Sequence, residues 1–278
     1  MLLRAADGAT AEVLEHGAHV TSWRPAPAGD ERLFLSSRSE FRDGVAIRGG
    51  IPVIFPQFAA EGPLPRHGFA RTMRWTLGAV DQSHGRASAR LHLAADRATR
   101  DIWPAEFAAE LHVDVGGDTL AVALQVHNAG REPFHFTAAL HTYLRVHDIG
   151  EAALHGLAGT RFRESAVPGV FRVDDEPVLR VHGEMDRVYA GATWPLTLRD
   201  GDRALEISAT GFPDAVVWNP GATKAAALAD MEPGGERRML CVEPAAVQQP
   251  VVLHPGEMWR GDQRLRALPP SPSRDSHG

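Results

Sequence analysis

The segment from Arg48 to Arg71 contains the most informative cluster of chemically active residue types in the chain. It reads IRGGIPVIFPQF and, after a short loop, LPRHGFAR, so that arginines stand beside glycines and His67 precedes a glycine. Arginine presents planar forked donors for hydroxyl or phosphate oxygens, and glycine lets the backbone approach a ligand closely. Residue types alone allow two interpretations: a pocket for a polar or anionic ligand, or loop arginines paired with surface carboxylates.

An alternating segment from Phe134 to His147 combines an apolar face with an unusual polar face. Apolar residues occupy the even positions except Thr142, whereas the odd positions read His135, Thr137, Ala139, His141, Tyr143, Arg145 and His147. Period-two alternation predicts a β-strand with one face towards a core. The other face carries imidazole, phenol and guanidinium groups in place of lysine and glutamate, which favours a cleft lining over plain solvent exposure.

Glu243 follows the apolar run from Met239 to Val242 and precedes a proline. A carboxylate in such a strand is unfavourable unless it faces a polar site. The alternative is an edge-strand carboxylate that meets solvent at the turn. We interpret Cys241, the only cysteine, as a small buried strand residue and not as a nucleophile.

Short strands separated by frequent turns are expected to position these side chains. The chain has 20 prolines and 27 glycines, and its strand-like runs include Leu111 to Val115 and Leu120 to Val126, which a GGD turn joins. These patterns predict an all-β fold with a short helix near Thr223 to Ala229. Residues 1–268 are predicted to form a single domain, and the low-complexity residues 269–278 are predicted to form a flexible tail.

Composition and charge exclude several classes of protein. Hydrophobic residues make up 44% of the 278 residues, which is enough for a substantial core. The net charge of -6 argues against a general nucleic-acid binder. One cysteine allows no internal disulfide, the N-terminus has no signal-like apolar region, and no apolar run reaches the roughly 18 residues of a membrane span. We expect a soluble cytoplasmic protein with no membrane partner.

Several widespread catalytic motifs are missing from the sequence. It contains no P-loop, no GxGxxG dinucleotide fingerprint and no GxSxG nucleophile elbow. The 14 histidines include no HExxH pair, and His16 and His19 have no obvious third ligand. We therefore expect neither phosphoryl transfer nor serine hydrolysis, and we expect no metal site.

Five motifs occur in the order in which one enzyme family has them. The Arg48 to Arg71 block is followed by ALHTYLRVHDI, MDRVY, AVVWNP and CVEPA. With these motifs the chain, from about its N-terminus to Leu265, resembles the hexose-6-phosphate mutarotases, also called glucose-6-phosphate 1-epimerases, within the broader aldose-1-epimerase group. The resemblance implies a large antiparallel β-sandwich of the galactose mutarotase-like type, with few short helices and an active site in a cleft on one sheet.

The resemblance also implies roles for single residues. His141 in HTY matches the family's general acid towards the sugar ring oxygen, and Glu243 matches its general base for the anomeric hydroxyl. The residues that match substrate contacts are Arg48, His67, Arg71 and Asp186. Anomers interconvert by ring opening, in which one group takes a proton and another gives one, so no cofactor is expected. The implied partner is a small-molecule hexose phosphate, and we expect a monomer.

Two positions depart from the family pattern. Arg66 stands where the family usually carries glutamine, and Gly221 stands where it often has a second tryptophan shortly after Trp218. We predict that Arg66 is a substrate-binding residue that strengthens phosphate binding. The alternative is that it merely pairs with Glu61. Trp218 either floors the cleft or belongs to the core.

Other functions remain open on sequence grounds. The same chemistry without a phosphate preference would make the chain an aldose 1-epimerase for free sugars. A sandwich that binds carbohydrate or phosphosugar without turnover is a further alternative, against which the presence of both His141 and Glu243 speaks. A glycosidase generally needs two suitably spaced carboxylates, and only Glu243 stands in a convincing context.

Overall fold

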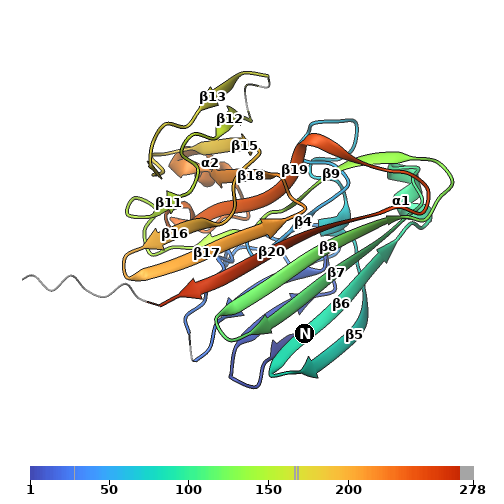
Figure 1. The fold of residues 1–278 in the computed structure, drawn as a ribbon, viewed down its shortest axis with the longest axis horizontal. Helices are drawn as coiled ribbons and strands as arrows, with labels where there is room; N and C mark the ends of the chain where they lie inside the picture. Colours follow the sequence, from blue (N-terminus) through green and yellow to red (C-terminus); the bar gives the residue numbers. More distant parts are fainter. Residues whose placement is uncertain (28, 166, 168, 270–278) are drawn as a thin grey trace, which may run out of the picture.

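Three antiparallel β-sheets make up most of the structure (Figure 1). The computed structural model describes residues 1–27, 29–165, 167 and 169–269. All pairings between the named strands of these residues are antiparallel. The predicted all-β class is therefore confirmed.

In the two larger sheets, several neighbouring strands come from distant parts of the sequence. The small sheet has the order β1 (Leu2–Arg4), β2 (Thr10–Leu14) and β3 (His19–Arg24). The eight-stranded sheet has the order β13 (Phe171–Val173), β12 (Arg161–Glu164), β15 (Met185–Ala190), β18 (Asp214–Asn219), β19 (Met239–Leu253), β9 (Phe134–Leu140) and β4 (Val53–Ile54), with β10 (Tyr143–Arg145) also paired to β19. The nine-stranded sheet has the order β14 (Val178–Leu179), β11 (Ala153–His155), β16 (Leu196–Asp200), β17 (Arg203–Thr210), β20 (Met258–Leu268), β8 (Thr119–Asn128), β7 (Phe107–Gly116), β6 (Arg86–Ala94) and β5 (Thr76–Ser83).

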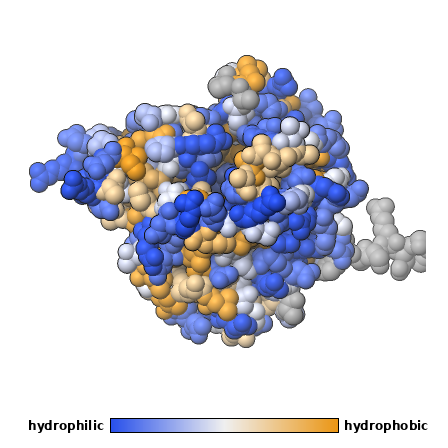
Figure 2. Space-filling model, turned by 180° about the vertical axis from the view of Figure 1, so that it is seen from behind, coloured by the Kyte–Doolittle hydropathy of each residue, from blue (hydrophilic) through white to orange (hydrophobic). Residues whose placement is uncertain are grey.

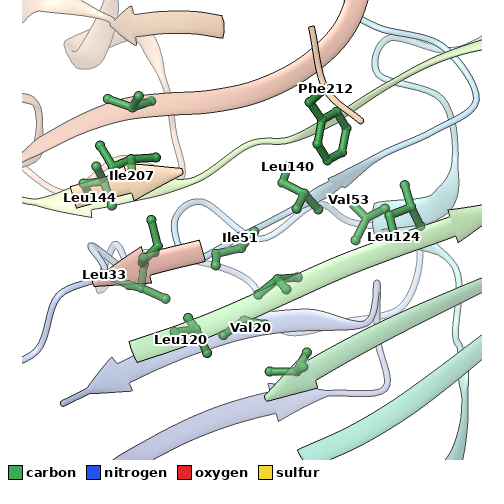
Figure 3. Close-up of a cluster of buried hydrophobic side chains, with 14 of the residues drawn as sticks. Val20, Leu33, Ile51, Val53, Leu120, Leu124, Leu140, Leu144, Ile207 and Phe212 are labelled. Atoms are coloured by element: carbon green, nitrogen blue, oxygen red, sulfur yellow. The ribbon is translucent and has the colours of Figure 1, made fainter. Parts of the chain in front are cut away.

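The main hydrophobic core joins the sheets through their apolar faces. Strand β8 contributes the alternating residues Leu120, Val122, Leu124 and Val126, all fully or almost fully buried. Figure 3 shows Leu124 beside Val53 and Leu120 beside Val20, residues from distant parts of the sequence in the same core cluster. On the outer face shown in Figure 2, polar residues predominate and apolar residues form patches between them. The eight-stranded and nine-stranded sheets each bury one face in this core, and together they form a sandwich.

Helices are few and short, as the sequence predicts. They are α1 (Arg97–Ile102) and α2 (Gly221–Ala227), with the 3-10 turns η1 (Ala70–Thr72) and η2 (Gly235–Arg238). Helix α2 is the predicted alanine-rich helix and begins two residues earlier than expected. No helix in the described ranges is long and apolar enough to cross a membrane.

The strand predicted across residues 134–147 is interrupted. Strand β9 ends at Leu140 and β10 begins at Tyr143. Thr142 is fully buried at the interruption, and its hydroxyl donates a hydrogen bond to Oε1 of Gln263 at 2.7 Å. The apolar even positions still face the main core. The predicted tail lies outside the described residues apart from Pro269, and the division into one domain and a tail stays a prediction.

Candidate functional site

The outer face of the eight-stranded sheet brings polar side chains together by register. Asp186 of β15 lies opposite Trp218 of β18, Trp218 lies opposite Cys241 of β19, and Cys241 lies opposite Tyr143 of β10. Glu243 follows two residues after Cys241 and therefore points to the same face. The alternation that sends Val217 and Val242 into the main core thus sends these groups outwards.

His141 lies in the short break between β9 and β10, on the same face as Ala139 before it and Tyr143 after it. Its backbone N–H donates to the carbonyl of Pro52 at 3.0 Å, and its ring stacks on Tyr143 with centroids 4.8 Å apart and planes 10° apart. The edge of Trp218 approaches the same ring at 5.8 Å. Two aromatic contacts therefore fix the plane of the imidazole.

His141 and Glu243 are in direct contact. Nδ1 of His141 lies 3.2 Å from Oε1 of Glu243, and the glutamate side chain is only 1% exposed. This contact does not have the geometry of a hydrogen bond. Nδ1 of His141 and Oε2 of Glu243 have no hydrogen-bond partner within the described part of the chain. Burial raises the pKa of Glu243 well above its usual value and lowers the pKa of His141 well below its own.

A pocket of about 700 Å³ opens over this pair. Its lining includes all seven residues predicted from the sequence: Arg48, Arg66, His67, Arg71, His141, Asp186 and Glu243. Trp218 lines the pocket and also packs in a small apolar cluster with Tyr143 and Met239. Both interpretations of this tryptophan are therefore correct.

Arg48 enters the pocket with its charge already balanced. It forms an ion pair with Asp230 at 3.1 Å, and its Nη1 donates to the Tyr143 hydroxyl at 3.0 Å. Burial alone would lower the pKa of Arg48, but Tyr143 and Asp230 raise it above its usual value. Arg48 thus connects the pocket to the tyrosine that stacks on His141.

Arg66 and Arg71 lack such compensation. Nη2 of Arg71 donates to the backbone carbonyl of Arg66 at 3.2 Å, and neither residue pairs with a carboxylate among the residues that the structure describes. Burial lowers the pKa of Arg71 to about 10, and the charges of Arg48 and Arg66 act in the same direction. Uncompensated guanidinium groups in a pocket favour an anionic ligand.

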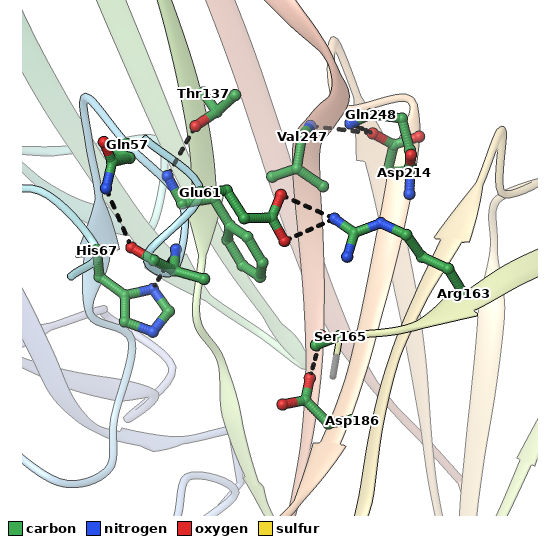
Figure 4. Close-up of polar contacts among 12 residues, drawn as sticks. Gln57, Glu61, His67, Thr137, Arg163, Ser165, Asp186, Asp214, Val247 and Gln248 are labelled. Carbon is green, nitrogen blue, oxygen red and sulfur yellow. Dashed lines mark hydrogen bonds and ion pairs between the residues drawn. The ribbon is translucent and has the colours of Figure 1, made fainter. Parts of the chain in front are cut away.

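The alternative that Arg66 pairs with Glu61 is wrong. Glu61 binds Arg163 instead, through both carboxylate oxygens at 2.7 and 2.8 Å (Figure 4). Arg163 comes from β12, and its side chain is 7% exposed. The pair ties the loop that carries Arg66 to β12, which pairs with β15, the strand of Asp186. Residue types in the sequence did not reveal this role.

His67 has an unusual backbone that aims its ring at the pocket. Its φ is 66°, in the left-handed region that non-glycine residues rarely adopt. Its Nδ1 accepts a hydrogen bond from the N–H of Ala59 at 3.3 Å, which leaves Nε2 to carry the ring proton. The rings of His67 and His141 are 5.7 Å apart, and burial followed by the charge of Arg71 lowers the pKa of His67. His67 is therefore a neutral hydrogen-bond donor.

Asp186 and Gly221 complete the site. Ser165 donates a hydrogen bond to Asp186 at 2.5 Å, while burial raises the pKa of the Asp186 carboxyl (Figure 4). Gly221 has φ +62°, and a Cβ there would lie 2.6 Å from the backbone nitrogen of Glu184. A tryptophan cannot replace this glycine without moving the backbone.

A second hollow, of about 560 Å³, lies around β2. None of the predicted site residues lines it. Its carboxylates Glu12 and Asp43 are exposed to solvent, and Glu15 pairs with Arg74 at 2.7 Å. The buried contact between His141 and Glu243 has no counterpart among these exposed or paired groups, so the other pocket is the candidate functional site.

Comparison with known proteins agrees with this assignment of the fold. The family model described as aldose 1-epimerase matches residues 1–266. A Cenchrus ciliaris protein named "Putative glucose-6-phosphate 1-epimerase" is 37% identical over 98% of this chain and 85% of its own length. An Escherichia coli (strain K12) protein of the same name is 34% identical over 82% of this chain and 77% of its own.

Solved structures also resemble this chain. A Salmonella typhimurium protein described as a "putative mutarotase" has a TM-score of 0.87 and 29% identity, and the match covers 94% of this chain and 88% of that chain. The large β-sandwich predicted from the sequence motifs is thereby confirmed.

Proposed function

Because the chain belongs to the aldose 1-epimerase family, we propose that it interconverts the α and β anomers of a hexose 6-phosphate. Membership makes it an isomerase, and the curated relatives carry the name of a glucose 6-phosphate epimerase. One observation carries the proposal: the buried contact of 3.2 Å between His141 and Glu243 faces a pocket that also holds two uncompensated arginines.

The reaction needs two proton transfers at the anomeric carbon. Glu243 takes the proton of the anomeric hydroxyl while His141 gives one to the ring oxygen, which opens the ring and leaves an aldehyde. Rotation about the bond next to the aldehyde presents its other face. Closure then returns the proton from the ring hydroxyl to His141 and the proton from Glu243 to the new anomeric hydroxyl.

One proton shared by the pair suffices for this cycle. The raised pKa of Glu243 and the lowered pKa of His141 favour a neutral carboxyl beside a neutral imidazole. Transfer of the carboxyl proton to Nδ1 across the 3.2 Å contact gives a carboxylate and an imidazolium, the forms that the ring opening uses. The charge of Arg71, which lowers the pKa of Glu243, stabilises the carboxylate in that state.

The other polar residues are proposed to bind the substrate. Arg66 and Arg71 would hold the phosphate, because their charges lack carboxylate partners in the described residues. Asp186 can accept hydrogen bonds from sugar hydroxyls, and His67 can donate one through Nε2. Arg48, already paired with Asp230, would act through its remaining donors.

Anomer exchange in purified protein tests this function. Exchange spectroscopy by NMR on glucose 6-phosphate should show acceleration that falls by about 10²- to 10⁴-fold in Glu243→Gln and His141→Asn, the usual contribution of general acid and base catalysis. The matched control is His147→Asn, because His147 also contacts a carboxylate, that of Asp200 at 3.0 Å, outside the pocket. Equal exchange rates in parent and pocket variants, with circular dichroism unchanged, would refute the assignment.

The same assay separates the alternatives. Equal acceleration of glucose and glucose 6-phosphate would make the chain an epimerase of free sugars. Saturable binding of glucose 6-phosphate without acceleration by the parent protein would make it a carbohydrate-binding sandwich. Faster exchange of the phosphorylated sugar supports the proposal.

We also propose that the chain acts as a cytoplasmic monomer. All seven predicted site residues come from one chain, so the proposed chemistry requires no second copy. Analytical ultracentrifugation should give the mass of a single 30.1 kDa chain, and activity should not depend on protein concentration. A stable dimer would contradict this part of the proposal.

A further inference from the structure

Cys241 forms the floor beneath the proposed catalytic pair. It lies on the same face of β19 as Glu243 and directly opposite Tyr143, which places it diagonally across from His141. A ring nitrogen of His141, Sγ of Cys241 and a carboxylate oxygen of Glu243 all lie within 4.8 Å of one another, and all three residues are buried. The anomer exchange derived above uses only two of these three groups.

Two of these groups have unused bonding capacity at this point. Nδ1 of His141 and Oε2 of Glu243 are buried and have no hydrogen-bond partner in the ranges described. Their side chains are 9% and 1% exposed. Because unsatisfied buried polar atoms cost free energy, their convergence on a thiol indicates that a further ligand can satisfy them.

We propose that His141, Cys241 and Glu243 form a binding site for a thiol-preferring divalent cation such as Zn²⁺ or Cd²⁺, and that the bound cation blocks anomer exchange. Imidazole nitrogen, thiolate sulfur and carboxylate oxygen are the donors that Zn²⁺ takes, at about 2.0 to 2.3 Å. The contact of 3.2 Å between His141 and Glu243 already suits two donors of one tetrahedral ion. The cysteine sulfur lies within 4.8 Å of the other two donor atoms and would move towards them on binding. His141 and Glu243 line the pocket from which the ion would enter.

Charge balance sets the kind of cation that fits. On binding, the Cys241 thiol and the Glu243 carboxyl each lose one proton to solvent, so that a thiolate and a carboxylate offset the doubly positive ion. The guanidinium groups of Arg48 and Arg71 act on His141 and oppose a cation nearby. A bond to the thiolate is needed to offset this repulsion. Mg²⁺ forms no strong bond to thiolate, so we expect it not to bind. The inhibition, but not the binding, rests on the proposed function.

The binding is directly observable because Cys241 is the only cysteine of the chain. Untagged full-length protein titrated with Cd²⁺ should develop the ultraviolet sulfur-to-cadmium charge-transfer absorption with a stoichiometry of one. Any such band must come from this thiol. Mg²⁺ should produce no change and should not compete with Cd²⁺.

Variants distinguish a three-residue site from a lone thiol. Cys241→Ser should remove the band, and His141→Asn should keep the thiol but weaken Cd²⁺ binding at least 10-fold. The control is His147→Asn, which alters a histidine–carboxylate contact with Asp200 that involves no cysteine. This variant should bind Cd²⁺ like the parent. Equal affinity of His141→Asn and parent, or absence of a stoichiometric band, would overturn the site.

The effect on exchange is measured separately. In the parent protein, Cd²⁺ should inhibit anomer exchange at the concentrations that develop the band, and chelation should restore the rate. Cys241→Ser, compared with its own metal-free rate, should require at least 10-fold more Cd²⁺. Binding without inhibition would overturn the second half of the proposal alone. If the parent accelerates no exchange, the titration still decides the binding, so the two failures remain distinguishable.

Discussion

The two walls of the pocket are built in different ways. The strand wall carries His141 and Glu243, whose positions follow from the pairing of β9, β10 and β19. The loop wall, residues 56–71, carries Arg66, His67 and Arg71 outside any strand. Side chains hold this loop: Gln57 exchanges two hydrogen bonds of 2.9 Å with the backbone of Leu64.

The difference matches the range over which each kind of group acts. Proton transfer works only within hydrogen-bond reach, about 3 Å, and strand register fixes atoms to that precision. Attraction between a guanidinium and a phosphate falls off slowly with distance, so a loop can supply it. The strand wall should therefore govern the chemical step, and the loop wall should govern which sugar is chosen.

The largest effect on the choice between charged and uncharged substrates should come from the loop wall. Arg71→Met should lower kcat/KM for glucose 6-phosphate about 100-fold, or about 2.7 kcal/mol, because a buried charge-assisted contact is lost. Glucose itself should lose far less, since it has no phosphate. Steady-state polarimetry on both sugars measures the difference.

Arg66→Gln provides the matched comparison, because Arg66 is exposed whereas Arg71 is half-buried. Its effect on kcat/KM for glucose 6-phosphate should be smaller, about threefold to fivefold, since solvent screens an exposed charge. If Arg71→Met slowed both sugars equally, the arginine would belong to the chemistry, and the division between the walls would fail.

On the strand wall, Glu243→Gln should stabilise the fold while it abolishes exchange. Burial raises the pKa of Glu243 in the folded protein above the unfolded value of about 4.3. A group with a raised folded pKa contributes stability below its unfolded pKa and loses that contribution as pH rises. Glutamine does not titrate, so the variant should gain about 1 to 3 kcal/mol over the parent at pH 8 and almost nothing at pH 4.

Urea unfolding of both proteins at several pH values checks this prediction. His141 acts in the opposite sense, because its lowered pKa removes stability as pH falls below about 6.5. To a first approximation this contribution is common to parent and variant and cancels in their difference. Glu206→Gln, which alters a carboxylate paired with Arg266 outside the pocket, is the control. If Glu243→Gln were less stable than the parent at pH 8, favourable contacts in the folded protein would compensate the burial of the Glu243 carboxylate, and the prediction would be wrong.

Sequence patterns could predict the strand wall because its geometry is periodic. Alternation identified which residues of 134–146 face the core, and the ordered motifs identified seven residues that all line one pocket. The partner of Thr142 at the break beside His141 was not predictable, because its hydroxyl bonds to Gln263, 121 residues later. Only the interruption of the apolar pattern by Thr142 signalled the break.

The loop wall was harder to predict because its supports come from distant segments. Glu61 and Arg163 are separated by 102 residues, and Arg48 and Tyr143 by 95. A buried arginine on a strand carries no local signal of its partner, which is why Arg66 was a plausible but wrong partner for Glu61. The glycine after His67 was the only local sign of the left-handed turn there.

The smallest effect tests whether the loop wall depends on its tie to β12. Glu61→Ala and Arg163→Met both remove the ion pair, and both should lower kcat/KM for glucose 6-phosphate by about twofold, or about 0.4 kcal/mol, because the loop that carries Arg66 and His67 loosens. The double variant should lose no more than either single variant, since each removes the same contact.

Stability should respond differently, because the two partners differ in exposure. Glu61 is 37% exposed and can turn to solvent when Arg163 is replaced, whereas Arg163 is 7% exposed and would be left as an unpaired buried cation when Glu61 is removed. Glu61→Ala should therefore lower the free energy of unfolding by about 1 to 3 kcal/mol, and Arg163→Met should change it little. Equal losses of activity with unequal losses of stability would identify the ion pair as a positioning contact. If the activity losses followed the stability losses, the variants would lose activity because the loop wall unfolds. The ion pair would then not position Arg66 and His67, and long-range attraction between the arginines and the phosphate would be enough for binding.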